Sequence, residues 1–141
     1  MNTISFPTAT HWLLVDDNKD ILRLMSTVLE GLTDATIECF NTPQSALAAF
    51  AESPEKYALV ITDFEMPGMD GVELCRWLRD ISPAQKIFLA TGSGFFTEAA
   101  ARHAGFSALL NKPFPLSALK SALAENFLMA AQKLPGSLMP A

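Results

Sequence analysis

Five polar side chains stand where short apolar runs of the sequence end. Asp16 and Asp17 follow one such run, Asp63 lies at the end of a second, Thr91 ends a third, and Lys112 ends a fourth. If these runs are strands of one parallel sheet, their carboxyl ends lie at one edge, which is where open α/β sheets bind ligands. We therefore expect carboxylates, a hydroxyl and an ammonium group at that edge, each close enough to the core to need a polar partner.

The three carboxylates at this edge indicate a metal site. Asp16, Asp17 and Asp63 would repel one another, and a hard divalent cation offsets such repulsion. Oxygen ligands favour Mg²⁺ or Mn²⁺, and the group lacks the His or Cys typical of zinc. For Asp16 and Asp17 alone, capping of the following helix is a simpler interpretation. That interpretation does not extend to Asp63, which comes after an apolar run and before a turn.

The apolar runs and the helical patterns between them predict an α/β fold with a doubly wound, five-stranded parallel sheet. Residues 12–15, 58–61 and 87–90 are almost entirely apolar, as expected for central strands with helices on both faces. Residues 36–40 and 107–111 are more polar and suit the two edges. Numbered along the chain, the strands are expected in the order 2-1-3-4-5.

Apolar residues at helical spacing predict five helices. We expect them after Asn18 to about Gly31, from Pro43 to before Pro54, after Gly71, over about 95–104, and from about Pro115. The fourth helix has no clear apolar stripe, so we expect it to be the most loosely packed. Residues 1–10 and 131–141 lack periodicity and are expected to be flexible tails around one domain at 11–130.

Length and composition fit one globular domain and exclude several classes of protein. The chain has 141 residues, of which 50% are hydrophobic and 18% charged. Ten basic against fifteen acidic residues, a net charge of −5, argue against direct nucleic-acid binding. No apolar run reaches the roughly 18 residues of a membrane span, and residues 1–5 do not resemble a signal peptide, so we expect a cytoplasmic protein. Cys39 and Cys75 fit no metal or redox spacing and are expected to be buried.

Four stretches of the sequence together resemble the receiver domains of two-component response regulators. They are residues 14–18, 61–71, 89–92 and 110–114, and the resemblance covers about residues 11–130. It implies a flavodoxin-like fold, Mg²⁺ in an acidic pocket, and phosphorylation of an aspartate by a histidine kinase or a histidine phosphotransfer protein. It also implies that the chain is not an enzyme beyond catalysing its own phosphorylation and dephosphorylation.

The resemblance implies a role for each acidic residue. Asp63 matches the phosphoacceptor, and Asp16 and Asp17 match the pair that binds Mg²⁺ directly or through water. Glu65 is expected to contribute its backbone carbonyl to the metal. The chemistry is consistent with these roles, because phosphoryl transfer to a carboxylate needs mainly positioning and charge neutralisation.

The resemblance also implies how a phosphoryl group becomes a signal. Thr91 matches the hydroxyl that moves to bind a phosphoryl oxygen, and Lys112 matches the cation that contacts the same group. The Lys112-Pro113 bond is often cis in this family. Movement of the hydroxyl vacates a space that an aromatic residue fills in the family, but Leu109 occupies that position here, so we expect a partial switch.

The face formed by the fourth helix, fifth strand and fifth helix is the expected output surface. Phe95 and Phe96, with Leu109, would form an apolar patch there that binds a downstream protein or a second copy of the chain. Alternatively, one Phe packs into the core and the other is an isolated surface side chain.

Three other functions remain open. A flavodoxin-like cofactor module would need a neutral, amide-rich loop after the first strand to hold phosphate, where Asp16 and Asp17 would repel it. A metal-dependent phosphatase with an aspartate nucleophile would place a second acid where Glu65 stands, but its nucleophile would follow the first strand and it would need a cap domain. A degenerate receiver would act only by protein contact. A stand-alone regulator, a phosphorelay intermediate and a piece of a hybrid kinase are all compatible with the receiver interpretation.

Overall fold

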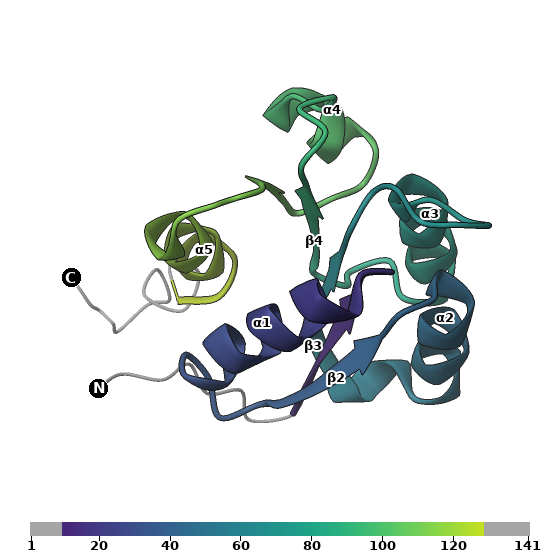
Figure 1. The fold of residues 1–141 in the computed structure, drawn as a ribbon. Coiled ribbons are helices and arrows are strands. Elements are labelled where there is room, and N and C mark those ends of the chain that lie inside the picture. Colours follow the sequence, from purple (N-terminus) through teal and green to yellow (C-terminus); the bar gives the residue numbers. More distant parts are fainter. Residues whose placement is uncertain (1–9, 129–141) are drawn as a thin grey trace, which may run out of the picture.

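The computed structural model describes residues 10–128, and in that part of the chain five parallel strands form one sheet between two layers of helices (Figure 1). The strands are β1 (His11–Val15), β2 (Thr36–Phe40), β3 (Tyr57–Thr62), β4 (Ile87–Thr91) and β5 (Ala108–Asn111). Their order is β2-β1-β3-β4-β5, which confirms the predicted topology. The predicted flexible tails lie, apart from residue 10, outside the described residues.

The pattern of burial confirms which strands are central. Strands β1, β3 and β4 are buried over nearly their whole length, whereas β2 and β5 keep exposed positions. Val15 pairs with Phe40 on one side and with Thr62 on the other, and Thr91 pairs with Asn111. The register therefore places the residues that follow β1, β3 and β5 at the same edge of the sheet.

In the described residues five helices follow the predicted plan, and α1 to α4 begin at polar caps. They are α1 (Lys19–Glu30), α2 (Pro43–Glu52), α3 (Gly71–Ile81), α4 (Glu98–His103) and α5 (Leu116–Leu123), with a short 3-10 turn at Pro54–Lys56 and a π-helical turn at Ala124–Leu128. The side chains of Asn18, Thr42 and Asp70 accept hydrogen bonds from the first-turn amides of α1, α2 and α3. These caps satisfy amides that have no partner within the helix.

Helix α4 is shorter than predicted, because it begins at Glu98 and not at Phe95. Thr97 caps it, with a side chain that accepts a hydrogen bond from the Ala100 amide. Gly94 has a φ of +68°, a left-handed conformation that cannot belong to a right-handed helix. Only Ala101 of this helix is buried.

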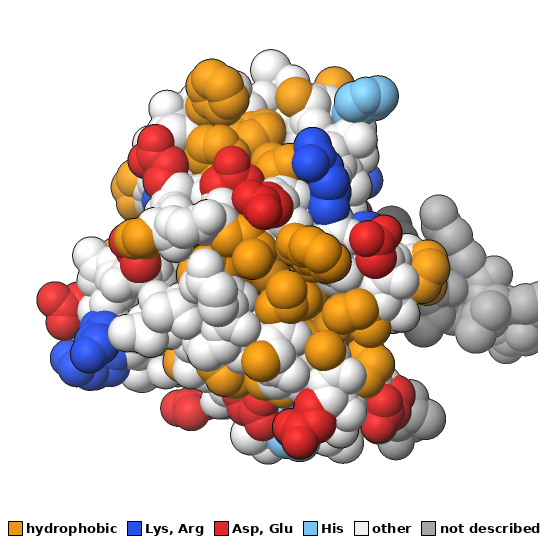
Figure 2. All heavy atoms as spheres, turned by 90° about the vertical axis from the view of Figure 1, so that its right-hand side faces the viewer, with side chains coloured by type: hydrophobic (Ala, Val, Ile, Leu, Met, Phe, Trp, Pro, Cys, Tyr) orange, Lys and Arg blue, Asp and Glu red, His pale blue; other side chains and the backbone are white. Residues whose placement is uncertain are grey.

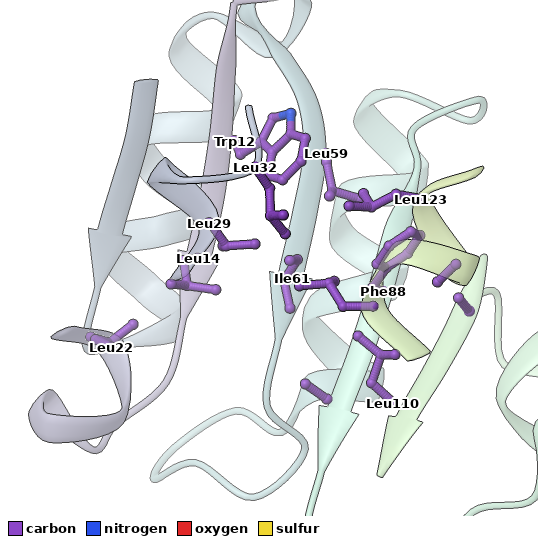
Figure 3. Packing of buried hydrophobic residues seen from close by; sticks show 14 residues of the cluster. Trp12, Leu14, Leu22, Leu29, Leu32, Leu59, Ile61, Phe88, Leu110 and Leu123 are labelled. Atoms are coloured by element: carbon purple, nitrogen blue, oxygen red, sulfur yellow. The ribbon is translucent and has the colours of Figure 1, made fainter. Parts of the chain in front are cut away.

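Two hydrophobic clusters hold the layers together, one on each face of the sheet. One joins the sheet to α1 and α5, and Figure 3 shows Leu29 of α1 near Leu14 of the sheet, and Leu123 of α5 near Leu59 and Phe88. The other joins the opposite face to α2, α3 and α4. This arrangement leaves the carboxyl edge of the sheet open between the two layers.

The cysteine prediction is half right. Cys75 is buried in the second cluster, as expected. Cys39 is exposed, because it lies on the edge strand β2, which has a neighbouring strand only on the β1 side.

Large hydrophobic side chains are also exposed on the helices. Trp77 and Ile81 of α3 are among them, and Figure 2, which looks onto α2 and α3, shows hydrophobic side chains across the middle of this face with acidic groups around them. Within residues 10–128, no helix has the length and apolar character needed to cross a membrane.

Candidate functional site

The backbone itself brings the predicted site residues together at the carboxyl edge of the sheet. The Asp63 N–H donates to the Val15 carbonyl at 3.0 Å, and the Lys112 N–H donates to the Thr91 carbonyl at 2.8 Å. The ladder hydrogen bonds thus continue one residue past the strands. Asp16, which directly follows β1, joins them at this edge.

Three carboxylates and one ammonium group form a single cluster. Oxygen atoms of Asp16, Asp17 and Asp63 all lie within 4.8 Å of one another. The Lys112 Nζ lies 2.6 Å from Asp16 Oδ2 and 3.5 Å from Asp63 Oδ1. When all four groups are ionised, the cluster carries a net charge of −2. One divalent cation would neutralise it, and the three carboxylates offer that cation only oxygen ligands. This donor set fits Mg²⁺ or Mn²⁺.

The capping interpretation of the acidic pair is wrong. Asn18 caps α1, with a side-chain oxygen that accepts hydrogen bonds from the amides of Asp20 and Ile21 at 2.9 and 3.1 Å. Asp16 is buried, and its Oδ1 accepts a hydrogen bond from the Asn18 amide at 2.9 Å while its Oδ2 pairs with Lys112. Asp16 therefore does not cap α1, and it contacts both Lys112 and the turn that leads into the helix.

The environment of Asp63 opposes its negative charge. Partial burial raises the pKa of this carboxyl above its ordinary value, the nearby Lys112 lowers the pKa, and the Asp16 charge raises it again. The net direction is upward. An ionised Asp63 therefore costs folding free energy in the metal-free protein.

A pH-dependent stability difference follows from that shift. An acid with a raised folded-state pKa destabilises the fold above that pKa, and this penalty disappears as pH falls to the ordinary aspartate value of about 3.9. We expect metal-free Asp63→Asn to have a larger free energy of unfolding than wild type at neutral pH. The gain should shrink toward about pH 4, as measured by urea denaturation at several pH values.

The exposed Asp34, which lies between α1 and β2, offers a matched control. Because its side chain is exposed, Asp34→Asn should leave the free energy of unfolding at neutral pH close to that of wild type. A lower stability of Asp63→Asn than of wild type at neutral pH would contradict the argument.

The remaining predicted residues lie around the cluster. Thr91 is buried, and its hydroxyl donates to Ser93 Oγ at 3.2 Å. Glu65 and Asp17 line the same open hollow. Within the described residues, the carboxylate cluster consists of Asp16, Asp17 and Asp63 and does not include the Glu65 side chain. The Lys112-Pro113 peptide bond is cis, as the resemblance implies.

An aromatic cluster that the sequence analysis missed adjoins the site. The Phe64 ring, directly after Asp63, stacks on Phe95 with centroids 5.9 Å apart and meets Phe96 edge-on at 4.9 Å. Phe96 packs partly buried against the second hydrophobic cluster, whereas Phe95 is 74% exposed. The alternative of one core Phe and one isolated surface Phe is therefore half right. Phe96 packs against the core, but the exposed Phe95 is not isolated, because its ring contacts Phe64 and Phe96.

A hydrophobic groove between α1 and α5 also reaches the site. It is lined by Leu24, Val28 and Leu116, which are exposed, and extends to Lys112 and Pro113. Helical spacing alone cannot reveal this groove, because spacing does not separate the apolar positions that the core covers from those left open at its border.

Comparison with known sequences gives one consistent family. The family described as "Response regulator receiver domain" matches residues 12–124. The response regulator receiver protein CpdR of Brucella abortus is 34% identical over 120 residues, which cover 84% of this chain and 97% of CpdR. The KDP operon transcriptional regulatory protein KdpE of Escherichia coli is 33% identical over 81% of this chain but only 49% of KdpE. The chain thus spans about half the length of KdpE and nearly all of CpdR.

Comparison with solved structures supports the fold. A response regulator receiver domain protein from Clostridium thermocellum superposes with a TM-score of 0.78 at 24% identity and covers 89% of this chain and 99% of that one. The receiver domain of the Arabidopsis thaliana histidine kinase CKI1, solved with Mg²⁺ and BeF₃⁻, has a TM-score of 0.72 at 23% identity over 83% of this chain and 89% of that one.

Proposed function

The chain belongs to the response regulator receiver family of two-component systems, and on that premise we propose that Asp63 accepts a phosphoryl group in a Mg²⁺-dependent reaction. The observation that carries this proposal is the cluster itself: three carboxylates with oxygens within 4.8 Å of one another, beside one lysine. The domain that acts in this way is proposed to span residues 11–130.

The carboxylates of Asp16, Asp17 and Asp63, with the backbone carbonyl of Glu65, would hold the Mg²⁺, and Mn²⁺ would fit the same oxygens. The bound cation supplies neutralisation of the charge on the phosphoryl group during transfer. The CKI1 receiver domain, which shares the fold, was solved with Mg²⁺ and BeF₃⁻, and this supports the assignment.

The transfer needs few groups from the protein. A carboxylate oxygen of Asp63 attacks the phosphorus atom of a phosphohistidine on the donor protein. A new O–P bond forms while the P–N bond breaks, and the bonding pair returns to the imidazole nitrogen. The Lys112 Nζ, 3.5 Å from Asp63 Oδ1, is placed to contact an oxygen of the transferred group and to balance its charge.

The phosphoryl group then acts through Thr91 on the face formed by α4, β5 and α5. The acceptor oxygens on Asp63 recruit the Thr91 hydroxyl, which moves the loop between β4 and α4. Leu109 is partly buried in the second cluster, and α4 contributes one buried residue, so the response is proposed to be a partial shift. The output is contact with a downstream protein or with a second copy of the chain, and not direct binding to nucleic acid or membrane.

A phosphodonor experiment separates this function from that of a phosphatase. We expect incubation with Mg²⁺ and phosphoramidate to add one phosphoryl group per chain, and expect EDTA to prevent the addition. The protein should not turn over 4-nitrophenyl phosphate. Multiple turnover of that ester would instead support the phosphatase alternative, whose second acid would be Glu65.

A further inference from the structure

A chain of short contacts links Thr91 to the surface. The Thr91 hydroxyl donates to Ser93 Oγ at 3.2 Å, and the Ser93 amide donates back to Thr91 Oγ1 at 3.2 Å. The Phe95 amide donates to the same Ser93 Oγ at 3.1 Å. Ser93 Oγ thus bridges a buried hydroxyl and the backbone of an exposed aromatic residue.

The Thr91 hydroxyl cannot serve Ser93 and a phosphoryl oxygen at once. A hydroxyl has one hydrogen to donate, and in this structure Thr91 donates it to Ser93. Recruitment of Thr91 to a group on Asp63 must therefore break the hydrogen bond that Thr91 donates to Ser93 Oγ. Ser93 is exposed, so water can replace Thr91 as its partner, whereas Thr91 is 1% exposed and needs a partner from the protein or the phosphoryl group.

Release of Ser93 would reach the aromatic cluster of Phe64, Phe95 and Phe96. Phe95 stacks on Phe64 at 5.9 Å and meets Phe96 at 5.4 Å, but most of its ring is exposed. Gly94, which follows Ser93, has the left-handed φ of +68°, and apart from its two chain neighbours no described residue has an atom within 4 Å of the place where a β-carbon would stand. Glycine adopts left-handed and right-handed φ at little cost, so Gly94 offers a point at which the segment that carries Ser93 and Phe95 can turn.

We infer that Ser93 is a positioning residue that holds the Thr91 hydroxyl away from Asp63 in the unphosphorylated protein, and that its release on phosphorylation separates Phe95 from Phe64. The inference rests on the proposed phosphorylation of Asp63. Through Ser93 a change at Asp63 would reach the surface without the aromatic residue that the family has at the position of Leu109.

The test measures the affinity for BeF₃⁻ and the environment of Phe95 together. The protein is labelled with 4-fluorophenylalanine at its 10 Phe residues, and the signal that is missing in Phe95→Leu is assigned to Phe95. BeF₃⁻ is then added stepwise in saturating Mg²⁺, and the ¹⁹F NMR spectrum is recorded at each step. In wild type the Phe95 signal should shift on binding. Ser93→Ala should lower the Kd for BeF₃⁻ roughly threefold to tenfold, since one hydrogen bond that opposes recruitment is lost.

The position of the Phe95 signal distinguishes two effects of Ser93→Ala. In a relay, loss of the Ser93 hydroxyl moves Phe95 toward its position in the BeF₃⁻-bound protein, whereas simple loosening of the loop does not move it along that path. In Ser93→Ala without BeF₃⁻, this signal should lie on the line between the free and bound wild-type positions. Ser93→Thr, which keeps the hydroxyl, should restore the wild-type Kd and signal, and Ser117→Ala on the exposed face of α5 should match wild type throughout.

Two results would overturn the inference: an equal or higher Kd in Ser93→Ala, or a Phe95 signal that stays at the free wild-type position. Failure of the proposed function looks different, because wild type itself would then bind no BeF₃⁻. Tighter binding together with the displaced Phe95 signal supports the relay.

Discussion

Replacing Lys112 with methionine is expected to slow phosphorylation of Asp63 by about a hundredfold or more, in line with the loss of one charge-stabilising group from other active sites. Methionine keeps most of the length of the side chain but removes the ammonium group, which lies 3.5 Å from Asp63 Oδ1. The rate of phosphorylation by phosphoramidate in saturating Mg²⁺, followed by intact mass, measures the effect. A change of less than about threefold would contradict the role given to Lys112, because one such interaction is worth far more.

The same substitution should destabilise the metal-free protein by about 3 kcal/mol, the lower end for breaking a buried ion pair. Asp16 is 4% exposed and would lose the cation that lies 2.6 Å from its Oδ2. Mg²⁺ should recover part of this loss, because it would neutralise the same carboxylates. Urea denaturation with and without Mg²⁺ checks both statements, and Lys120→Met on the exposed side of α5 should change neither quantity.

A substitution in the core between the sheet and the α1–α5 layer should lower the free energy of unfolding at least as much as the loss of Lys112. Leu59→Ala is expected to lower the free energy of unfolding by about 3 to 5 kcal/mol, because a leucine removed from a packed core leaves a cavity as well as losing its transfer free energy. Leu59 is fully buried on the central strand β3 and packs beside Ile61 and Phe88 (Figure 3).

An identical substitution on the surface provides the control. Leu24 of α1 is 62% exposed, so Leu24→Ala should change the free energy of unfolding by about 0.5 kcal/mol or less. Equal effects of the two substitutions in urea denaturation would show that this cluster does not carry the stability assigned to it.

The central strands and the acidic edge were predictable because few physical rules determine them. Continuous apolar runs must be covered on both faces, and parallel strands place their carboxyl ends together, so Asp16, Asp63 and Lys112 had to lie along one edge of the sheet. Asp16 and Asp63 follow neighbouring strands, whereas Lys112 follows β5, three strands from β1, and reaches Asp16 through its long side chain.

The loop between β4 and α4 was not predictable in the same way. The sequence predicted a helix from about Phe95 although it has no clear apolar stripe there, but Thr97 has an extended backbone and caps a helix that begins at Glu98. Thr97 directly before Glu98 is a recognisable start signal that the prediction overlooked. Ser93 gives no periodic signal, because its role depends on a turn that folds its hydroxyl back onto Thr91.

The most direct test of the central claim is the intact mass of wild type and of Asp63→Asn after incubation with Mg²⁺ and phosphoramidate. Our account predicts that wild type gains one phosphoryl group and that Asp63→Asn gains none. An equal gain in both proteins would place the phosphoryl group on another residue and contradict the assignment of Asp63. No gain in wild type under conditions where Mg²⁺ binds would contradict the proposed phosphoacceptor function.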